Sequence, residues 1–215
     1  MRILYVTLGI VVADQITKLL VKGFAVPVLG ITHKGYQIGT SFSVVGDFIR
    51  LTYIENPGMA FGIDFGGKMF LTLFSIAASV GIFLYLLRIR NESFIVRLSL
   101  AMILGGAVGN LIDRIFYGVI FGTAPLFYGH VVDFVDIDFF NLSFLGYNIT
   151  RWPVFNIADA SESVGVVVLL LFHRRFAGAG HEARTAEARI GASAAHLEGG
   201  IEAAVEKSDP GSTST

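Results

Sequence analysis

Long apolar runs alternate along the chain with polar, glycine-rich stretches. Four of the runs are long enough for membrane helices, at about residues 3–21, 69–87, 94–116 and 152–172. About 20 apolar residues cross the hydrocarbon core of a bilayer, which is roughly 30 Å thick. We expect the last helix to begin near Trp152-Pro153, because proline is favoured in a first helical turn. The pattern predicts an all-α polytopic membrane protein with four transmembrane helices.

Two stretches between these helices show the alternating pattern of strands. Within residues 23–67, the runs Gln37 to Val45 and Phe48 to Ile54 are typical of short strands. Residues 117–151 contain the run from His130 to Asp136, whose spacing matches no strong metal motif and favours a surface strand. We therefore expect a small extracytoplasmic β-sheet on the outer, membrane-facing surface, and no metal.

Composition supports a membrane protein, since 53% of the residues are hydrophobic and only 15% are charged. A net charge of −1 argues against a nucleic-acid partner, and the absence of cysteine excludes disulfides, thiolate metal sites and cysteine nucleophiles. The N-terminal run resembles a signal peptide, but Asp14 and Lys18 interrupt it, so we expect a retained first helix. Residues 177–215 contain few large apolar side chains, which predicts a polar, disordered tail after a membrane domain of residues 1–176.

Four helices would place both termini on the same side of the membrane. The side with more positive charge in its short loops is normally cytoplasmic. The short connection between the second and third helices carries Arg88, Arg90 and Arg97. Basic residues also occur in the outer loops, but the rule gives most weight to short loops, and it therefore predicts cytoplasmic termini.

One short pattern occurs twice, as Asn110-Leu-Ile-Asp113 and as Asn156-Ile-Ala-Asp159. Residues at this spacing lie on the same face of a helix. A carboxylate in hydrocarbon costs about 2.5–3.5 kcal/mol, so two such pairs in apolar runs indicate a function. The alternative is that each aspartate only caps a helix end.

The helix lengths predict that these aspartates lie at the same depth. Asp113 lies 16 residues from Arg97, and Asp159 lies 14 residues from His173. These separations correspond to about 24 Å and about 21 Å, near the outer edge of the membrane core. Lys18 reaches the same level, and its spacing from Asp14 favours an intrahelical ion pair, which is as much a structural as a catalytic feature. Two nearby carboxylates in a low-dielectric site share a proton, as in aspartic proteases.

Five motifs of the chain look like those of the lipoprotein signal peptidase family, signal peptidase II, and they occur in the family's order. They are Asp14-Gln-x-x-Lys18, Asn56-x-Gly58-x-Ala60-Phe61-Gly62, Gly105-Gly106-x-x-Gly109-Asn110-x-x-Asp113-Arg114, Val131-Val132-Asp133-Phe134 and Phe155-Asn156-x-Ala158-Asp159. The resemblance covers residues 1 to 175 and implies an inner-membrane aspartyl protease with its site near the periplasmic face. It implies that Asp113 and Asp159 are catalytic. The chain departs from the family in a longer segment after Arg114 and in Glu162, a third carboxylate one turn from Asp159.

The resemblance also implies a substrate, a prolipoprotein whose lipobox cysteine carries diacylglycerol and is preceded by the cleaved bond. We expect substrate-binding roles for Asn56, Asn110, Arg114 and Asn156, and structural roles for Asp14, Lys18 and Asp133. Asn56 has an alternative role in stabilising the Pro57-Gly58 turn. We expect a monomer that contacts membrane lipids and uses no cofactor. The rival hypothesis is a small proton-coupled carrier with the aspartates as a relay, which the lack of an inverted repeat disfavours.

Overall fold

The computed structural model describes residues 2–58, 67–138, 142–144, 147–149 and 152–172. The chain divides into two units, Met1–Leu169 and Leu170–Thr215, and the features below belong to the first. Within the described residues, three helices are long and apolar enough to cross a membrane: Leu4–Lys22, Lys68–Arg88 and Phe94–Ile120. The first three predicted membrane helices are thereby confirmed. The predicted tail lies outside the described residues.

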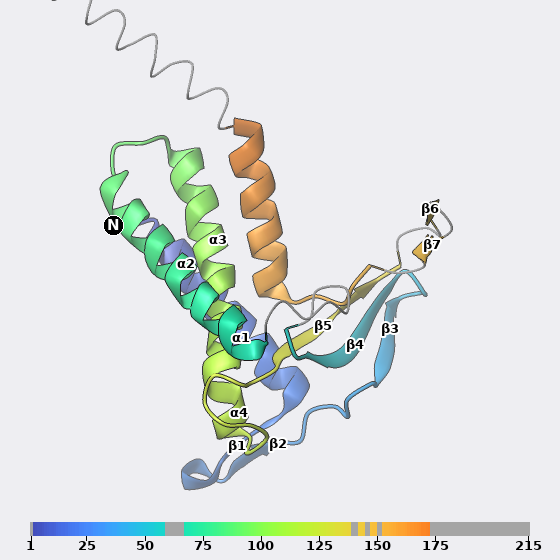
Figure 1. The fold of residues 1–215 in the computed structure, drawn as a ribbon. Helices are drawn as coiled ribbons and strands as arrows, with labels where there is room; N and C mark the ends of the chain where they lie inside the picture. The colour runs from blue at the N-terminus through green and yellow to red at the C-terminus, as the bar shows by residue number, and fades with distance from the viewer. Residues whose placement is uncertain (1, 59–66, 139–141, 145–146, 150–151, 173–215) are drawn as a thin grey trace, which may run out of the picture. The chain divides into compact units, whose positions relative to one another are not determined.

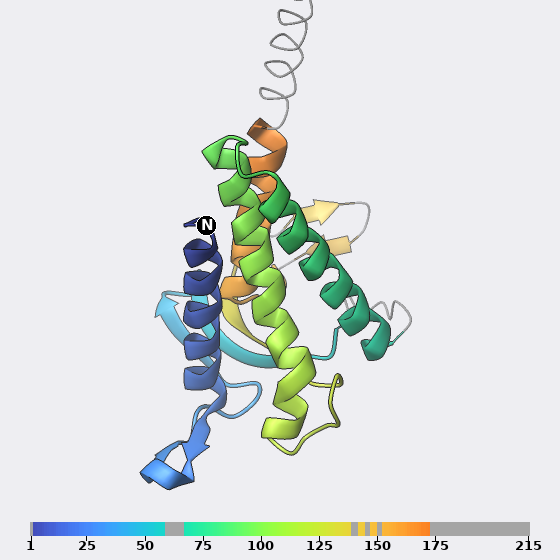
Figure 2. The same cartoon turned by 90° about the vertical axis from the view of Figure 1, so that its left-hand side faces the viewer.

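Three helices pack side by side (Figures 1 and 2). They are α1 (Leu4–Lys22), α2 (Lys68–Arg88) and α3 (Phe94–Ile112). In Figure 2, α3 (light green) lies between α1 (blue) and α2 (green), and it contacts both. The Ser93 hydroxyl caps α3 by accepting a hydrogen bond from the Val96 N–H at 3.3 Å. A π-helical turn at Asp113–Tyr117 and the short α4 (Gly118–Ile120) continue α3.

A further helical segment covers residues 157–172, so the predicted start near Trp152-Pro153 is wrong. Phe155 is held in an extended conformation, because its N–H and C=O both pair with Val135, at 3.0 and 2.7 Å. The Asn156 side chain then caps the helix by accepting a hydrogen bond from the Asp159 N–H at 2.9 Å. The start of this helix is therefore set by strand pairing and an asparagine cap, and not by Pro153.

The strands form small antiparallel sheets. The largest has the order β3-β4-β5, with β3 at Ser41–Val45, β4 at Ile49–Asn56 and β5 at Val131–Ile137. Two hairpins complete the set, with strands β1 (Phe24–Val26), β2 (Ile31–His33), β6 (Leu142–Phe144) and β7 (Tyr147–Ile149). The predicted strands are confirmed as strands, although β3 begins four residues later than expected, because Gln37 and Thr40 form a turn. The expectation of a surface strand at residues 130–136 is wrong, since β5 is mostly buried where it packs on the helices.

Small residues allow the helices to approach closely. A side chain on Gly109 would place its Cβ 2.7 Å from an Asp14 carboxylate oxygen, and one on Gly105 would meet Ile10 of α1 at 2.9 Å. A Cβ on Gly165 would lie 2.8 Å from the Ser99 carbonyl oxygen of α3. The glycine cluster of α3 therefore serves helix packing, as the sequence predicts for small residues in membrane helices.

A cluster of apolar side chains attaches the three-stranded sheet to the helices. Tyr53 of β4, with Val132 and Phe134 of β5, packs with Val21 of α1 and Tyr117 of the π-helical turn. Because side chains alternate along a strand, Asp133 points away from this cluster and toward the polar residues described next.

Candidate active site

Lys18 occupies the centre of a buried polar layer between α1 and α3. Its ammonium group lies 2.8 Å from a carboxylate oxygen of Asp14 and 2.8 Å from one of Asp113, and all three side chains are fully buried. It also donates a hydrogen bond to Asn110 Oδ1 at 2.9 Å. One cation thus holds two carboxylates that would otherwise be buried without a counter-charge. The predicted ion pair between Asp14 and Lys18 is confirmed.

Each oxygen of Asp113 is occupied by donors from the protein. Oδ2 accepts from Lys18 and, at 3.2 Å, from the Val132 N–H of β5. Oδ1 accepts from the Gln15 amide at 2.9 Å. Through these contacts Asp113 ties α1, α3 and β5 together, and its side chain is closed off from solvent.

Two asparagines extend the layer toward the start of the last helix. The Asn110 amide donates to Asp159 Oδ1 at 2.8 Å, and its oxygen accepts from Asn156 at 3.1 Å. The Asn156 amide also donates to Asp133 Oδ1 at 2.7 Å. The structure thus joins both Asn-x-x-Asp motifs in one network, while their depth in the membrane stays a prediction.

Asp159 combines a helix cap with access to solvent. Its Oδ2 accepts from the Asn156 N–H at 3.2 Å, while Asn156 Oδ1 accepts from the Asp159 N–H. This reciprocal pair is a capping box. A helix N-terminus also favours a negative charge. Unlike Asp113, Asp159 is only partly buried, so its carboxylate can meet a substrate.

Asp133 of β5 lies beside Asp159 in an environment that disfavours its charge. It is 1% exposed. Burial, reinforced by the negative charge of Asp159, raises the pKa of the Asp133 carboxyl to about 7. Hydrogen bonds from Asn56 and Asn156 oppose this rise. A carboxyl group that is half protonated near neutral pH, next to a partner that favours ionisation, is suited to proton transfer.

Asn56 makes two contacts within the protein. Its oxygen accepts from the Gly58 N–H at 2.9 Å, which supports the turn, and its side chain also hydrogen-bonds Asp133. Arg114 lies in the π-helical turn and is partly exposed. Its role in substrate binding stays a prediction. The second half of the Asn56 motif, residues 59–62, lies outside the described residues.

A second charged cluster anchors the ends of two helices to the sheet. Lys22 of α1 pairs with Glu55 of β4, whose carboxylate also accepts from the Tyr53 hydroxyl at 2.6 Å. The Lys68 ammonium, at the start of α2, lies 2.7 Å from His130 Nε2, and the other ring nitrogen lies 3.6 Å from Glu55. Since Lys68 can only donate, His130 accepts at Nε2 and carries its hydrogen on Nδ1.

The structure brings Asp133, for which the sequence predicts a structural role, into the same network as Asp159. The repeated Asn-x-x-Asp pattern drew attention to the helices, whereas Asp133 reaches the site from a strand. The available signal was the Val131-Val132-Asp133-Phe134 motif, in which a lone carboxylate interrupts apolar residues. All four residues of that motif are buried.

Comparison with known proteins identifies the family. The family model described as signal peptidase (SPase) II matches residues 6–175. A lipoprotein signal peptidase of Chlorobaculum parvum is 36% identical over 78% of this chain and 91% of its own length, and one of Chlorobium phaeobacteroides is 35% identical over 76% and 84%. A solved structure titled as a bacterial membrane enzyme aligns with a TM-score of 0.59 and 26% identity, over 81% of this chain and 88% of that chain. The chain belongs to the signal peptidase II family of membrane peptidases.

Proposed function

We propose that this protein is an intramembrane aspartyl endopeptidase that removes signal peptides from diacylglyceryl-modified prolipoproteins. The bond cleaved is the one just before the lipidated lipobox cysteine. Membership of the signal peptidase II family and the names of its relatives support the substrate class. The carrier alternative receives no support from these comparisons.

The observation that carries the proposal is the pair of carboxylates bridged by Asn156. Its side-chain amide bonds Asp133 and its backbone N–H bonds Asp159. The sequence motifs predict Asp113 as the partner of Asp159. The contacts favour Asp133, because the Asp113 oxygens are occupied by Lys18, Gln15 and Val132. We therefore assign the catalytic pair to Asp133 and Asp159.

In this mechanism the two carboxyl groups have different roles. Asp159, which accepts two N–H donors at the start of a helix, is the base and takes a proton from a water molecule. The water oxygen attacks the carbonyl carbon of the scissile bond. Asp133 is protonated, since burial disfavours its charge, and it donates its proton to the carbonyl oxygen. When the tetrahedral intermediate collapses, the C–N bond breaks and the leaving amine takes the proton held by Asp159. As the C=O bond re-forms, a hydroxyl of the intermediate returns a proton to Asp133.

The remaining polar residues support this pair. Asn110 and Asn156 orient Asp159 and Asp133 through their amides. Asp14, Lys18 and Asp113 fix the spacing of α1, α3 and β5. We assign Arg114 to substrate binding, because its partly exposed guanidinium can reach a peptide carbonyl or a lipid phosphate near the membrane interface.

The proposal includes an orientation in the bacterial inner membrane. The helix at residues 157–172 forms a fourth span, both termini are cytoplasmic, and the carboxylate pair lies near the periplasmic face. Residues 1–176 form the peptidase domain, residues 177–215 form a cytoplasmic tail, and the protein acts as a monomer. The predicted depth of Asp159 and the short arginine-rich connection after α2 support this arrangement.

A comparison of two peptides tests the function. The purified full-length protein is incubated with a lipobox peptide that carries diacylglycerol on its cysteine and with the same peptide unlipidated. Mass spectrometry of the products is expected to show a single cut before the cysteine in the lipidated peptide only. Equal cleavage of both peptides, or a cut elsewhere, contradicts the proposed specificity.

A further inference from the structure

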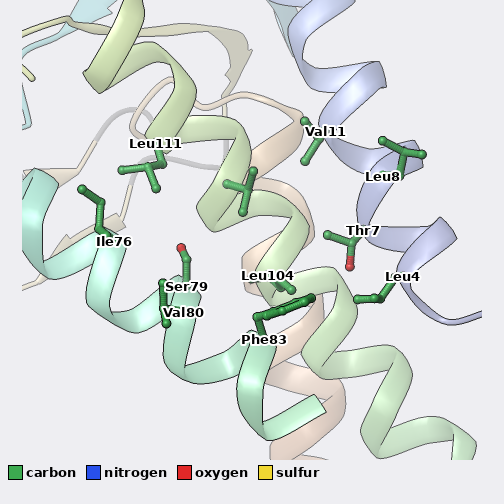
Figure 3. Close-up of a pocket in the computed structure, with 11 residues that line it drawn as sticks. Leu4, Thr7, Leu8, Val11, Ile76, Ser79, Val80, Phe83, Leu104 and Leu111 are labelled. Carbon is green, nitrogen blue, oxygen red and sulfur yellow. The ribbon is translucent and has the colours of Figure 1, made fainter. Parts of the chain in front are cut away.

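An apolar groove of about 500 Å³ runs between α1 and α2, with α3 as its floor (Figure 3). Its lining repeats every three or four residues, with Leu4, Leu8 and Val11 on α1 and Ile76, Val80 and Phe83 on α2. Leu104 and Leu111 of α3 form the floor. Each helix therefore presents an apolar stripe about two turns long, the pattern by which grooves bind an apolar helix.

One polar group in the groove lacks a partner. Ser79 lines it from α2 and is 6% exposed, and its hydroxyl makes no hydrogen bond within the described residues. In contrast, the Thr7 hydroxyl across the groove donates to the Ala101 carbonyl at 2.9 Å. A buried hydroxyl without a partner is costly, so the empty groove leaves Ser79 in an unfavourable state.

This hydroxyl discriminates between two apolar occupants. Ser79 lies 11 residues into α2, about 16 Å from its first residue and thus near the middle of the membrane. A lipid acyl chain has no hydrogen-bonding group at that depth. A polypeptide helix has carbonyl and side-chain oxygens, and serine hydroxyls commonly bond across helices in membranes. The contacts therefore favour a helix over an acyl chain.

The groove also has a defined position relative to the polar layer. It ends at Val11 of α1, three residues before Asp14, which corresponds to about 4.5 Å along the helix. A helix lying in the groove would deliver its outer end to the level of the buried ion pairs. The exposed lining residues, such as Leu8 at 56% and Val80 at 50%, leave the groove open for entry from the lipid.

We propose that the groove between α1 and α2 binds the apolar helix of the substrate's signal peptide, and that Ser79 hydrogen-bonds that helix. This inference rests on the proposed function, since it identifies the part of the prolipoprotein that the enzyme recognises away from the cleaved bond. Binding along two helical turns places the start of the lipobox at the polar layer.

Filling the groove tests the proposal. Val80→Trp places a large ring in the groove, and Leu84→Trp is the matched control, because Leu84 is 56% exposed on the same helix and does not line the groove. Each variant is assayed with a full-length lipidated prolipoprotein and with a short lipidated peptide that lacks the apolar helix. For Val80→Trp we expect KM for the full-length substrate to rise about tenfold, or ~1.4 kcal/mol of binding. The short peptide should be cleaved at the wild-type rate, and Leu84→Trp should change neither.

The outcomes separate this proposal from the function on which it rests. Wild-type protein that cleaves neither substrate contradicts the proposed function. The groove proposal alone is overturned if the wild-type protein cleaves both substrates and Val80→Trp either lowers cleavage of both equally or lowers neither. Melting temperatures in detergent show whether each variant is folded.

Cross-linking identifies the occupant directly. A photoreactive amino acid is placed at position 80 or 84 of the full-length Asp159→Asn protein, which is expected to bind but not cleave. We expect position 80 to cross-link to the signal peptide of a bound prolipoprotein and position 84 not to do so. Cross-links from position 80 to lipid only would overturn the proposal.

Ser79→Ala is expected to raise KM for the full-length substrate about threefold, because the variant loses one hydrogen bond of modest strength to the bound helix.

Discussion

The polar layer has two halves that share the same residue types and differ in their surroundings. In the inner half, Asp14 and Asp113 are fully buried around the Lys18 ammonium. In the outer half, Asp133 and Asp159 accept hydrogen bonds from asparagine amides, and Asp159 is partly exposed. The inner carboxylates are therefore paired with a buried cation, whereas the outer two accept hydrogen bonds from neutral amides.

This difference shows why a motif does not determine what an aspartate does. Asp113 and Asp159 occupy equivalent positions in two copies of Asn-x-x-Asp. One ends α3 next to a buried lysine, and the other caps a helix that starts at the edge of a sheet. The lysine counter-charge distinguishes Asp113 from both proposed catalytic carboxylates, and access to solvent distinguishes it from Asp159.

The largest expected effect is the loss of cleavage when the outer pair is neutralised. Asp133→Asn or Asp159→Asn removes a group that must transfer a proton, and each should lower kcat at least about 10³-fold. Asparagine keeps the shape of the side chain, so we expect both variants to remain folded. Single-turnover cleavage of the lipidated peptide and melting in detergent measure the two effects.

Asp113→Asn is the matched control for this comparison. It breaks a buried ion pair, so it should lower stability while the molecules that remain folded still cleave substrate. The opposite result, an inactive Asp113→Asn protein and an active Asp133→Asn protein, would return the catalytic role to Asp113.

The inner half should instead dominate stability. Lys18→Met leaves Asp14 and Asp113 buried without their cation, which should cost about 3–5 kcal/mol of unfolding free energy. Arg50→Met is the control, because its partner Asp47 is exposed and a surface ion pair contributes little to stability. Denaturation in mixed micelles measures both changes. Similar losses in the two variants would contradict a special role for the buried cation.

Most of the helices and the depth of the polar residues can be predicted from the sequence, because hydropathy and the helical rise are local properties. Contacts between distant segments cannot be predicted in this way. The pairing of Phe155 with Val135 delays the last helix, and the docking of β5 brings Asp133 beside Asp159 and the Val132 N–H to Asp113. The proposed assignment of the catalytic pair rests on these long-range contacts.

The pH dependence should distinguish the two halves. The pKa of Asp133 is raised to about 7, mainly by burial, from about 4 in an unfolded chain. The folded state therefore holds this proton more tightly. The resulting stability is fully present below pH 4 and is lost as the pH rises through 7. We expect the wild-type protein to lose stability between about pH 4 and 7, and to lose cleavage activity as the pH rises through the pKa of Asp133 at about 7.

A melting series of wild-type and Asp133→Asn proteins across this range tests the assignment. The Asp133→Asn protein should lose the dependence near pH 7, because asparagine does not titrate. His130 titrates in a neighbouring range, since burial and the Lys68 charge lower its pKa, so the series is repeated in a His130→Gln background. If the melting temperature still changes with pH in Asp133→Asn but no longer does so in His130→Gln, the titration belongs to the histidine.

The smallest effect is expected from substitution of Asn56, which hydrogen-bonds Asp133 but is not one of the two proposed catalytic carboxylates. Its hydrogen bond lowers the pKa of Asp133, so Asn56→Ala should raise that pKa and move the upper limb of the rate profile to higher pH. The lost contacts should cost about 1 kcal/mol of stability.

Thr52→Val is the control, since it removes a 2.8 Å hydrogen bond to Asp136 between the same two strands and should leave the profile in place. If Asn56→Ala raises KM with no shift in the profile, the asparagine binds substrate, as the sequence motif predicts. A shifted pH–rate profile with an unchanged KM would show that Asn56 acts by tuning the pKa of Asp133, and so affects the chemistry of the pair.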